Sequence, residues 1–197
     1  MEICVDLETG GTSQDAAILA LACQAFDPYD PSNLPDPLVL AVEPEENDKY
    51  ERTWSGATIQ WWSRQPEALS ILSSLPISTL PRLTRLFTEY CVNNRVTAIW
   101  ANSPSFDLAI LRHLYCSLEM RFPISYWQER DIRTIKALLP AQFHPPFIGI
   151  KHHPLDDVLH EIRIVHTFLS IVEVPTHDYP RANQLPGDAS RTLQPTP

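Results

Sequence analysis

The first strand of the chain carries an alternation that restricts the folds and sites it can form. Residues 3–9 read Ile-Cys-Val-Asp-Leu-Glu-Thr, followed by two glycines that allow a tight turn. Successive side chains of a strand point to opposite faces, so Asp6 and Glu8 share one face while Val5 and Leu7 share the other. Two carboxylates this close repel each other unless a proton or a cation lies between them. The stretch therefore predicts either a Mg²⁺ or Mn²⁺ site or an acidic strand end that faces solvent.

The length and composition bound the class of protein. A chain of 197 residues with 44% hydrophobic and 20% charged residues is typical of one soluble domain. No apolar run reaches the ~20 residues that a membrane span needs, and the N-terminus lacks the pattern of a signal peptide, so a cytoplasmic location is expected. Four scattered cysteines form no CxxC pair, which predicts small core residues rather than a zinc or redox site; they are Cys4, Cys23, Cys91 and Cys116.

The formal net charge of -9 limits how this chain could bind nucleic acid. Sequence-independent binding along a long duplex uses a basic stripe, which is not expected here. A site that takes only a few nucleotides remains compatible with this charge, because bound metal ions would supply the positive charge.

The order of the periodic segments predicts an α/β fold with a mixed β-sheet flanked by helices. Strands are expected at 16–26, 38–42 and 96–101, and helices at 58–65, 66–72, 78–94, 106–119, the second part of 126–139, and 154–173. Ser78 and Ser105 are the expected N-caps, and the acidic stretch 43–52 is expected to be exposed. Residues 175–197 have no apolar periodicity and contain five prolines. We therefore predict one domain over residues 1–174 and a poorly ordered tail over 175–197.

Further acids and a histidine occur where these elements begin. Asp107 opens a helix after an apolar strand, His152 lies just before the last helix, and Asp156 or Asp157 lies in that helix's first turn. With the two acids of the first strand, this set suits phosphodiester cleavage with two divalent metals held by carboxylates. A nearby histidine can take the proton of the attacking water, because an imidazole titrates near neutral pH.

Three segments resemble the motifs of a known superfamily. Asp6-Leu7-Glu8-Thr9 resembles the DxET motif of the DEDD 3'→5' exonucleases, and residues 102–107 match their second motif, N-x-x-x-F-D. Residues 152–157 resemble the third motif of the histidine-bearing DEDDh subclass, H-x-A-L-x-D. Within it, the chain is most similar to the group of mycobacterial exoribonuclease and phage or exonuclease VIII-like proteins, on the paired tryptophans and the glutamine of residues 58–65.

The resemblance implies a ribonuclease H-like fold and removal of nucleoside 5'-monophosphates from the 3' end of single-stranded RNA or DNA. It implies two Mg²⁺ or Mn²⁺ ions per active site, and RNA is favoured over DNA. A homodimer is a further option, since dimers are common in this superfamily. The implied metal ligands are Asp6, Glu8, Asp107 and Asp157, with His152 as the general base. The alternative is a catalytically inactive module of the same fold that binds 3' ends.

The third motif departs from the family pattern in two ways. Pro154 replaces the expected alanine, and His153 with Asp156 or Asp157 forms an alternative pair. The five-residue step from His152 to Asp157 fits the motif, so this pair is preferred.

Four further residues are candidate substrate contacts. The backbone of Thr9 could meet the terminal 3'-hydroxyl, as the family implies, and Trp61 could stack on a base. Phe106 lies next to the second acid, and Lys151 next to the expected base could meet a phosphate. Three of them have an ordinary alternative: Phe106 in the core, one tryptophan buried with its neighbour half-exposed, and Lys151 solvated.

Overall fold

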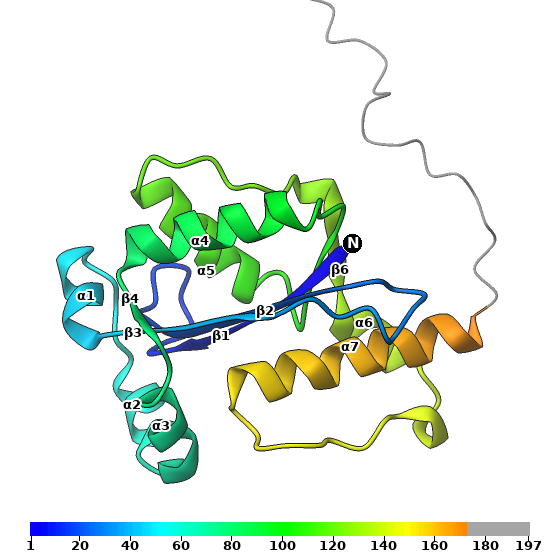
Figure 1. The fold of residues 1–197 in the computed structure, drawn as a ribbon. Coiled ribbons are helices and arrows are strands. Elements are labelled where there is room, and N and C mark those ends of the chain that lie inside the picture. Colours follow the sequence, from blue (N-terminus) through cyan, green and yellow to red (C-terminus); the bar gives the residue numbers. More distant parts are fainter. Residues whose placement is uncertain (173–197) are drawn as a thin grey trace, which may run out of the picture.

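The computed structural model describes residues 1–172, which form a mixed six-stranded sheet with helices on both faces (Figure 1). The strand order is β4-β3-β2-β1-β5-β6. The strands are β1 (Glu2–Thr9), β2 (Ile18–Phe26), β3 (Leu38–Val42), β4 (Ile77–Ser78), β5 (Ile99–Ala101) and β6 (Glu129–Asp131). β1 and β3 run antiparallel to β2, whereas β1 with β5, β5 with β6, and β3 with β4 are parallel. The predicted fold class is confirmed; the tail 175–197 lies outside the described residues.

The described part of the chain also contains seven α-helices and two short 3₁₀ helices. The α-helices are α1 (Pro44–Lys49), α2 (Gly56–Trp62), α3 (Pro66–Leu72), α4 (Leu80–Asn93), α5 (Asp107–Ser117), α6 (Ile132–Leu138) and α7 (Pro154–Ile171). The 3₁₀ helices are η1 (Tyr126–Gln128) and η2 (Ala141–Phe143). No helix in residues 1–172 is both long and apolar enough to cross a bilayer.

The alternation of β1 divides the core into two layers. Val5 and Leu7 pack with α4 and α5 on one face, whereas Cys4 packs with α6 and α7 on the other. Figure 1 shows these helix pairs on opposite sides of the sheet. Asp6 and Glu8 have the parity of Cys4, so they share one face of β1, as the sequence predicts, and that face is the one covered by α7.

Two predicted N-caps were wrong. Ser78 is part of β4 and Thr79 caps α4, its side chain accepting from the N–H of Arg82. Ser105 caps nothing: its hydroxyl bonds that of Ser103 at 2.7 Å, and Phe106 holds the cap position of α5 without a side-chain bond. Both errors are one-residue shifts, within which a sequence pattern alone does not fix a helix start.

The acidic stretch 43–52, predicted to be exposed, is the largest correction. It contains α1, and Glu46, Asn47 and Arg52 are buried. The Asn47 amide accepts from the N–H of Ile18 and donates to its carbonyl, both at 2.8 Å, and Arg52 Nε donates to the carbonyl of Ala16 at 2.7 Å. These polar groups are buried because they satisfy the backbone at the start of β2.

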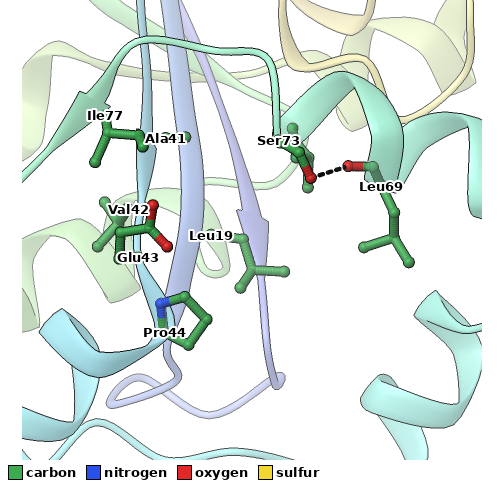
Figure 2. A pocket seen from close by; sticks show the side chains of 9 residues that line it. Leu19, Ala41, Val42, Glu43, Pro44, Leu69, Ser73 and Ile77 are labelled. Carbon is green, nitrogen blue, oxygen red and sulfur yellow. Dashed lines mark hydrogen bonds between the residues drawn. The ribbon is translucent and has the colours of Figure 1, made fainter.

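Two smaller features complete the fold. Cys4, Cys23 and Cys91 are buried as predicted, whereas Cys116 is exposed; all four are free thiols. An apolar cavity of about 160 Å³ lies between β3, β4 and α3 (Figure 2). Leu19, Ala41 and Ile77 contribute to its wall, and none of the predicted site residues lines it.

Candidate active site

The acids of β1 lie at the end of the strand, where regular pairing stops. Glu8 is 7% exposed, and the register between β1 and β2 shifts between Glu8 and Thr9. Beyond this shift, the N–H of Gly10 donates to the carbonyl of Ala17 at 2.8 Å and starts the turn. The carboxylates therefore project from a strand that is fixed on both sides, directly before a tight turn.

Asp107 joins them because β5 is shorter than β1. The two strands pair only at Ile3 with Ile99 and Cys4 with Trp100, and β5 ends at Ala101. The N–H of Leu7 therefore lies beyond the ladder, and Asp107 Oδ1 accepts from it at 3.2 Å. Asp107 is the first residue of α5 and is 3% exposed. The second acid is thus held against β1 by a backbone donor that the sheet leaves free.

The loop before α7 brings His152 and Asp157 to the same place. His152 has a φ of +65°, and its N–H donates to Asp157 Oδ2 at 2.8 Å. Glu8, His152 and Asp157 each offer one ligand atom, and these atoms lie within 4.8 Å of one another. The strand and the helix thus meet through two carboxylates and an imidazole.

His153 and Asp156, the alternative residues of the third motif, accept hydrogen bonds from the backbone at the start of α7 and in the loop before it. His153 Nδ1 accepts from the N–H of Asp156 at 3.2 Å and caps α7. Asp156 Oδ2 accepts from the N–H of Ile150 at 2.9 Å and packs against Gly149, whose φ is +117°. His153 and Asp156 therefore fix the conformation of the loop, while their neighbours His152 and Asp157 lie beside Glu8.

The paired tryptophans of α2 contact this histidine. Trp61 is 37% exposed, and its ring meets that of His152 edge-on at 4.7 Å between centroids. Trp62 is 5% exposed and donates from Nε1 to the carbonyl of Thr9 at 2.9 Å. One tryptophan is thus buried and one half-exposed, and together they tie the end of β1 to the loop of His152.

The other predicted substrate contacts lie around this centre. Thr9 is buried, and its carbonyl is taken by Trp62. Phe106 is partly buried and packs on the core beneath α4 and α5. Lys151 is exposed at the rim of a cavity that His152 also lines. The structure therefore places Trp61 and Lys151 beside the acids with free surface, and Phe106 mainly in the core.

Sequence reasoning missed one acid, Glu161 of α7. It lies one helical turn after Asp157 on the same side of the helix and is 4% exposed. The Cys4 thiol donates to its Oε2 at 3.2 Å. The available signal was a glutamate within the apolar stripe of α7, at the i+4 position from a candidate ligand.

Burial and mutual repulsion shift the pKa values of these acids upward. Burial, followed by the charges of Glu8 and Asp107, raises the pKa of Asp6 well above its ordinary value. Burial and the Asp157 and Asp107 carboxyls raise the pKa of Glu8 to about 8. Burial raises the pKa of Glu161 to about 8 and that of Asp107 to about 7, with the N–H of Leu7 opposing the rise at Asp107. Burial also raises the pKa of Asp157.

The donor set fits a hard divalent cation. Carboxylate oxygens from two strand positions and two helix starts converge, and a cation between them would relieve the repulsion that raises their pKa values. Oxygen ligands of this kind select Mg²⁺ or Mn²⁺ over softer metals. The cluster of Glu8, His152 and Asp157 is therefore a candidate metal site.

The chain matches known proteins over most of its length. Residues 1–169 match the family model of the 3'-5' exoribonuclease Rv2179c-like domain. An exodeoxyribonuclease of Enterobacteria phage T4 is 30% identical over 168 residues, covering 68% of this chain and 70% of that protein.

A solved structure shares the fold. The nuclease domain of 3'hExo, a DEDDh family member bound to rAMP, matches with a TM-score of 0.59 and 13% identity. The match covers 86% of this chain and 91% of that one. Its ribonuclease H-like architecture agrees with the mixed sheet and flanking helices described above. On the family match over residues 1–169, the chain belongs to the family of 3'-5' exoribonuclease Rv2179c-like domains, and it is a 3'-5' exonuclease.

Proposed function

We propose that this exonuclease degrades single-stranded RNA from the 3' end, releases nucleoside 5'-monophosphates, and requires Mg²⁺ or Mn²⁺. The observation that carries the proposal is the convergence of Glu8, His152 and Asp157 within 4.8 Å, with Asp107 held on β1. Acids from separate motifs gather here although their charges repel each other. Such a costly arrangement is typical of a functional site rather than of a packing solution.

The residues divide between holding metal and moving a proton. Asp6, Glu8, Asp107 and Asp157 are the proposed ligands, the first two from β1 and the others from the first turns of α5 and α7. When bound, two divalent ions supply charge stabilisation for the attacking and the leaving oxygen. His152 is the proposed general base and takes the proton from the attacking water.

The surroundings of His152 hold its ring in place for this role. The rings of Trp61 and His152 pack in a T-shaped arrangement, and the backbone N–H of His152 donates to Asp157. The loop conformation that presents the ring has a positive φ, which Gly149 and the cap at His153 help to maintain. Preorganisation of this kind reduces the rearrangement needed during the reaction.

The substrate side of the site is also a proposal. In this proposal the half-exposed ring of Trp61 would stack on a base, the backbone of Thr9 would meet the terminal 3'-hydroxyl, and Phe106 would support the second acid from the core. RNA is preferred because the family is described as exoribonuclease, although the T4 relative is named an exodeoxyribonuclease. A cytoplasmic location and a homodimer remain predictions; light scattering of the purified protein would test the second.

The test is a side-by-side digestion of RNA and DNA oligomers of the same sequence, labelled at the 5' end, in Mn²⁺. We expect a ladder that shortens from the 3' end, faster on RNA, and none with Asp107→Ala. A faster ladder on DNA would contradict the substrate assignment. Tight binding to 3' ends without any product would favour the inactive binding module.

A further inference from the structure

A cavity of about 360 Å³ is lined by His152 but not by Trp61, whose ring contacts that histidine. Its walls come from one face of α7, the end of β5 at Asn102, α6, and the loop that joins α6 to α7. In Figure 1, α2 stands beside the N-terminal end of α7, whereas this loop runs back beneath α7. The cavity is thus continuous with the catalytic acids but separate from the surface that Trp61 offers. Its volume is in the range of small-ligand sites.

Positive and titratable groups are concentrated in this cavity. The whole chain contains three lysines and seven histidines and has a net charge of -9. Two of the lysines, Lys136 and Lys151, line the cavity, as do His144 and His160 in addition to His152. Among residues 1–172, the ion pairs within 4.0 Å involve neither of these lysines. Two of the three lysines of this acidic protein therefore line one cavity, and neither forms an ion pair within the described residues.

Two buried nitrogen atoms nearby lack partners. His160 Nδ1 and Arg163 Nε are buried, and neither forms a hydrogen bond within residues 1–172. Burial, followed by the charges of Arg163, Lys136 and Lys151, lowers the pKa of His160. Buried polar atoms without partners are rare in folded proteins, and His160 itself lines the cavity.

The two acids that line the cavity, Asp157 and Glu161, lie on the side that adjoins the candidate metal site. Asp157 and Glu161 line it from the same face of α7 as His160. Asp157 is a proposed metal ligand, and Glu161 accepts from the Cys4 thiol beneath the sheet. Cations bound at the catalytic acids would offset their charge, and the lysines and His160 would then dominate the remainder of the cavity.

We propose that this cavity binds a phosphate group of the nucleic-acid strand on the 5' side of the scissile bond. The inference rests on the proposed function, because Thr9 and Trp61 there receive the 3'-terminal nucleotide. The strand then passes His152 and enters the cavity, where Lys136, Lys151 and His160 contact the next phosphate upstream. A lysine acts on phosphate as a mobile point charge, so such a contact favours affinity without base preference.

Dinucleotides with and without a 5'-phosphate isolate this contact, because only the phosphorylated form has a phosphate upstream of the scissile one. For the wild type we expect the 5'-phosphate to lower KM by about tenfold, the effect of one charge-assisted contact, with kcat unchanged. Lys136→Gln should erase that preference and leave the unphosphorylated dinucleotide unaffected. Lys49→Gln is the matched control, because Lys49 lies on α1 and pairs with Glu46.

A binding measurement without turnover gives a second readout. With Asp107→Asn as background, the affinity for a labelled oligomer is followed by fluorescence anisotropy against salt. One lost phosphate contact should reduce the slope of log K against log salt by about 0.7 for Lys136→Gln and leave it unchanged for Lys49→Gln.

Three results would overturn the proposal. The wild type could cleave both dinucleotides with the same KM, or Lys136→Gln could slow both equally. Alternatively, Lys136→Gln could weaken inhibition by a free nucleoside 5'-monophosphate while the preference for the 5'-phosphate stays; the cavity would then hold the released product. A wild type that cleaves neither the dinucleotides nor longer strands would instead refute the proposed function.

Discussion

Raising the pH of the metal-free protein should destabilise it, because its buried acids hold protons that the unfolded chain loses. The pKa of Glu8 and of Glu161 is about 8 in the fold, and that of Asp107 is about 7, against ordinary values near 4. Between these limits the folded state binds more protons than the unfolded state, so stability falls as pH rises. Over the range from pH 5 to pH 8, which lies between the unfolded and the folded pKa values, stability should fall continuously.

The magnitude follows from the number of protons retained. One retained proton gives a slope of about 1.4 kcal/mol per pH unit, hence about 3 kcal/mol between pH 5 and pH 7. For a domain of this size that change corresponds to roughly 6–12 °C in Tm. More than one of the three carboxyls contributes, so this is the smallest drop that the structure supports.

The assay is thermal unfolding in a chelator from pH 5 to pH 8, repeated with Mn²⁺. The cation should largely remove the slope, since it takes the place of the protons. Glu161→Gln should make the chelator curve shallower and raise Tm near pH 8, whereas Glu67→Gln, at an exposed position on α3, should not. A stability that is flat or rises over this range in the chelator would refute the reasoning.

Three further substitutions have expected outcomes. His152→Ala should lower kcat by about 10²–10⁴-fold in single-turnover assays with little change in Tm, and a loss below tenfold would move the proton transfer elsewhere. Trp62→Phe removes the bond to the Thr9 carbonyl, so we expect a loss of about 1 kcal/mol in urea unfolding and reduced activity; unchanged stability would show that bond to be unimportant. Gly149→Ala meets both a positive φ and the Asp156 carboxyl, so activity should fall through the loop of His152, and full activity with wild-type Tm would contradict that.

The sequence predicted the parts of the site that depend on local pattern. Alternation in β1 places Asp6 and Glu8 on one face whatever the rest of the chain does, and the structure has them on the α7 face. The position of Asp107 beside these two acids is harder to predict from the sequence. It depends on β5 ending early, which leaves the N–H of Leu7 free to bond the Asp107 carboxylate. A three-residue strand within an apolar run of six is decided by tertiary packing.

Long-range polar contacts account for what the sequence did not predict. Asn47 looked like part of an exposed acidic stretch, and its burial is explained only by the backbone of Ile18, which lies far from it in the chain. Glu161 likewise lies within an apolar helix face, and its hydrogen-bond partner Cys4 comes from β1, far away in the sequence. In both cases the polar residue is satisfied by a segment whose proximity no periodicity reveals.

Two neighbouring aspartates allow the most direct test of the site. Asp157 lies beside Glu8 and His152, whereas Asp156 bonds the loop at Ile150, so each variant is the control of the other. The measurement is 3'-end digestion of a 5'-labelled RNA by chelator-stripped protein with Mn²⁺ added back. We predict that Asp157→Asn abolishes the ladder and that Asp156→Asn retains it at reduced rate; an active Asp157→Asn with an inactive Asp156→Asn would contradict the account.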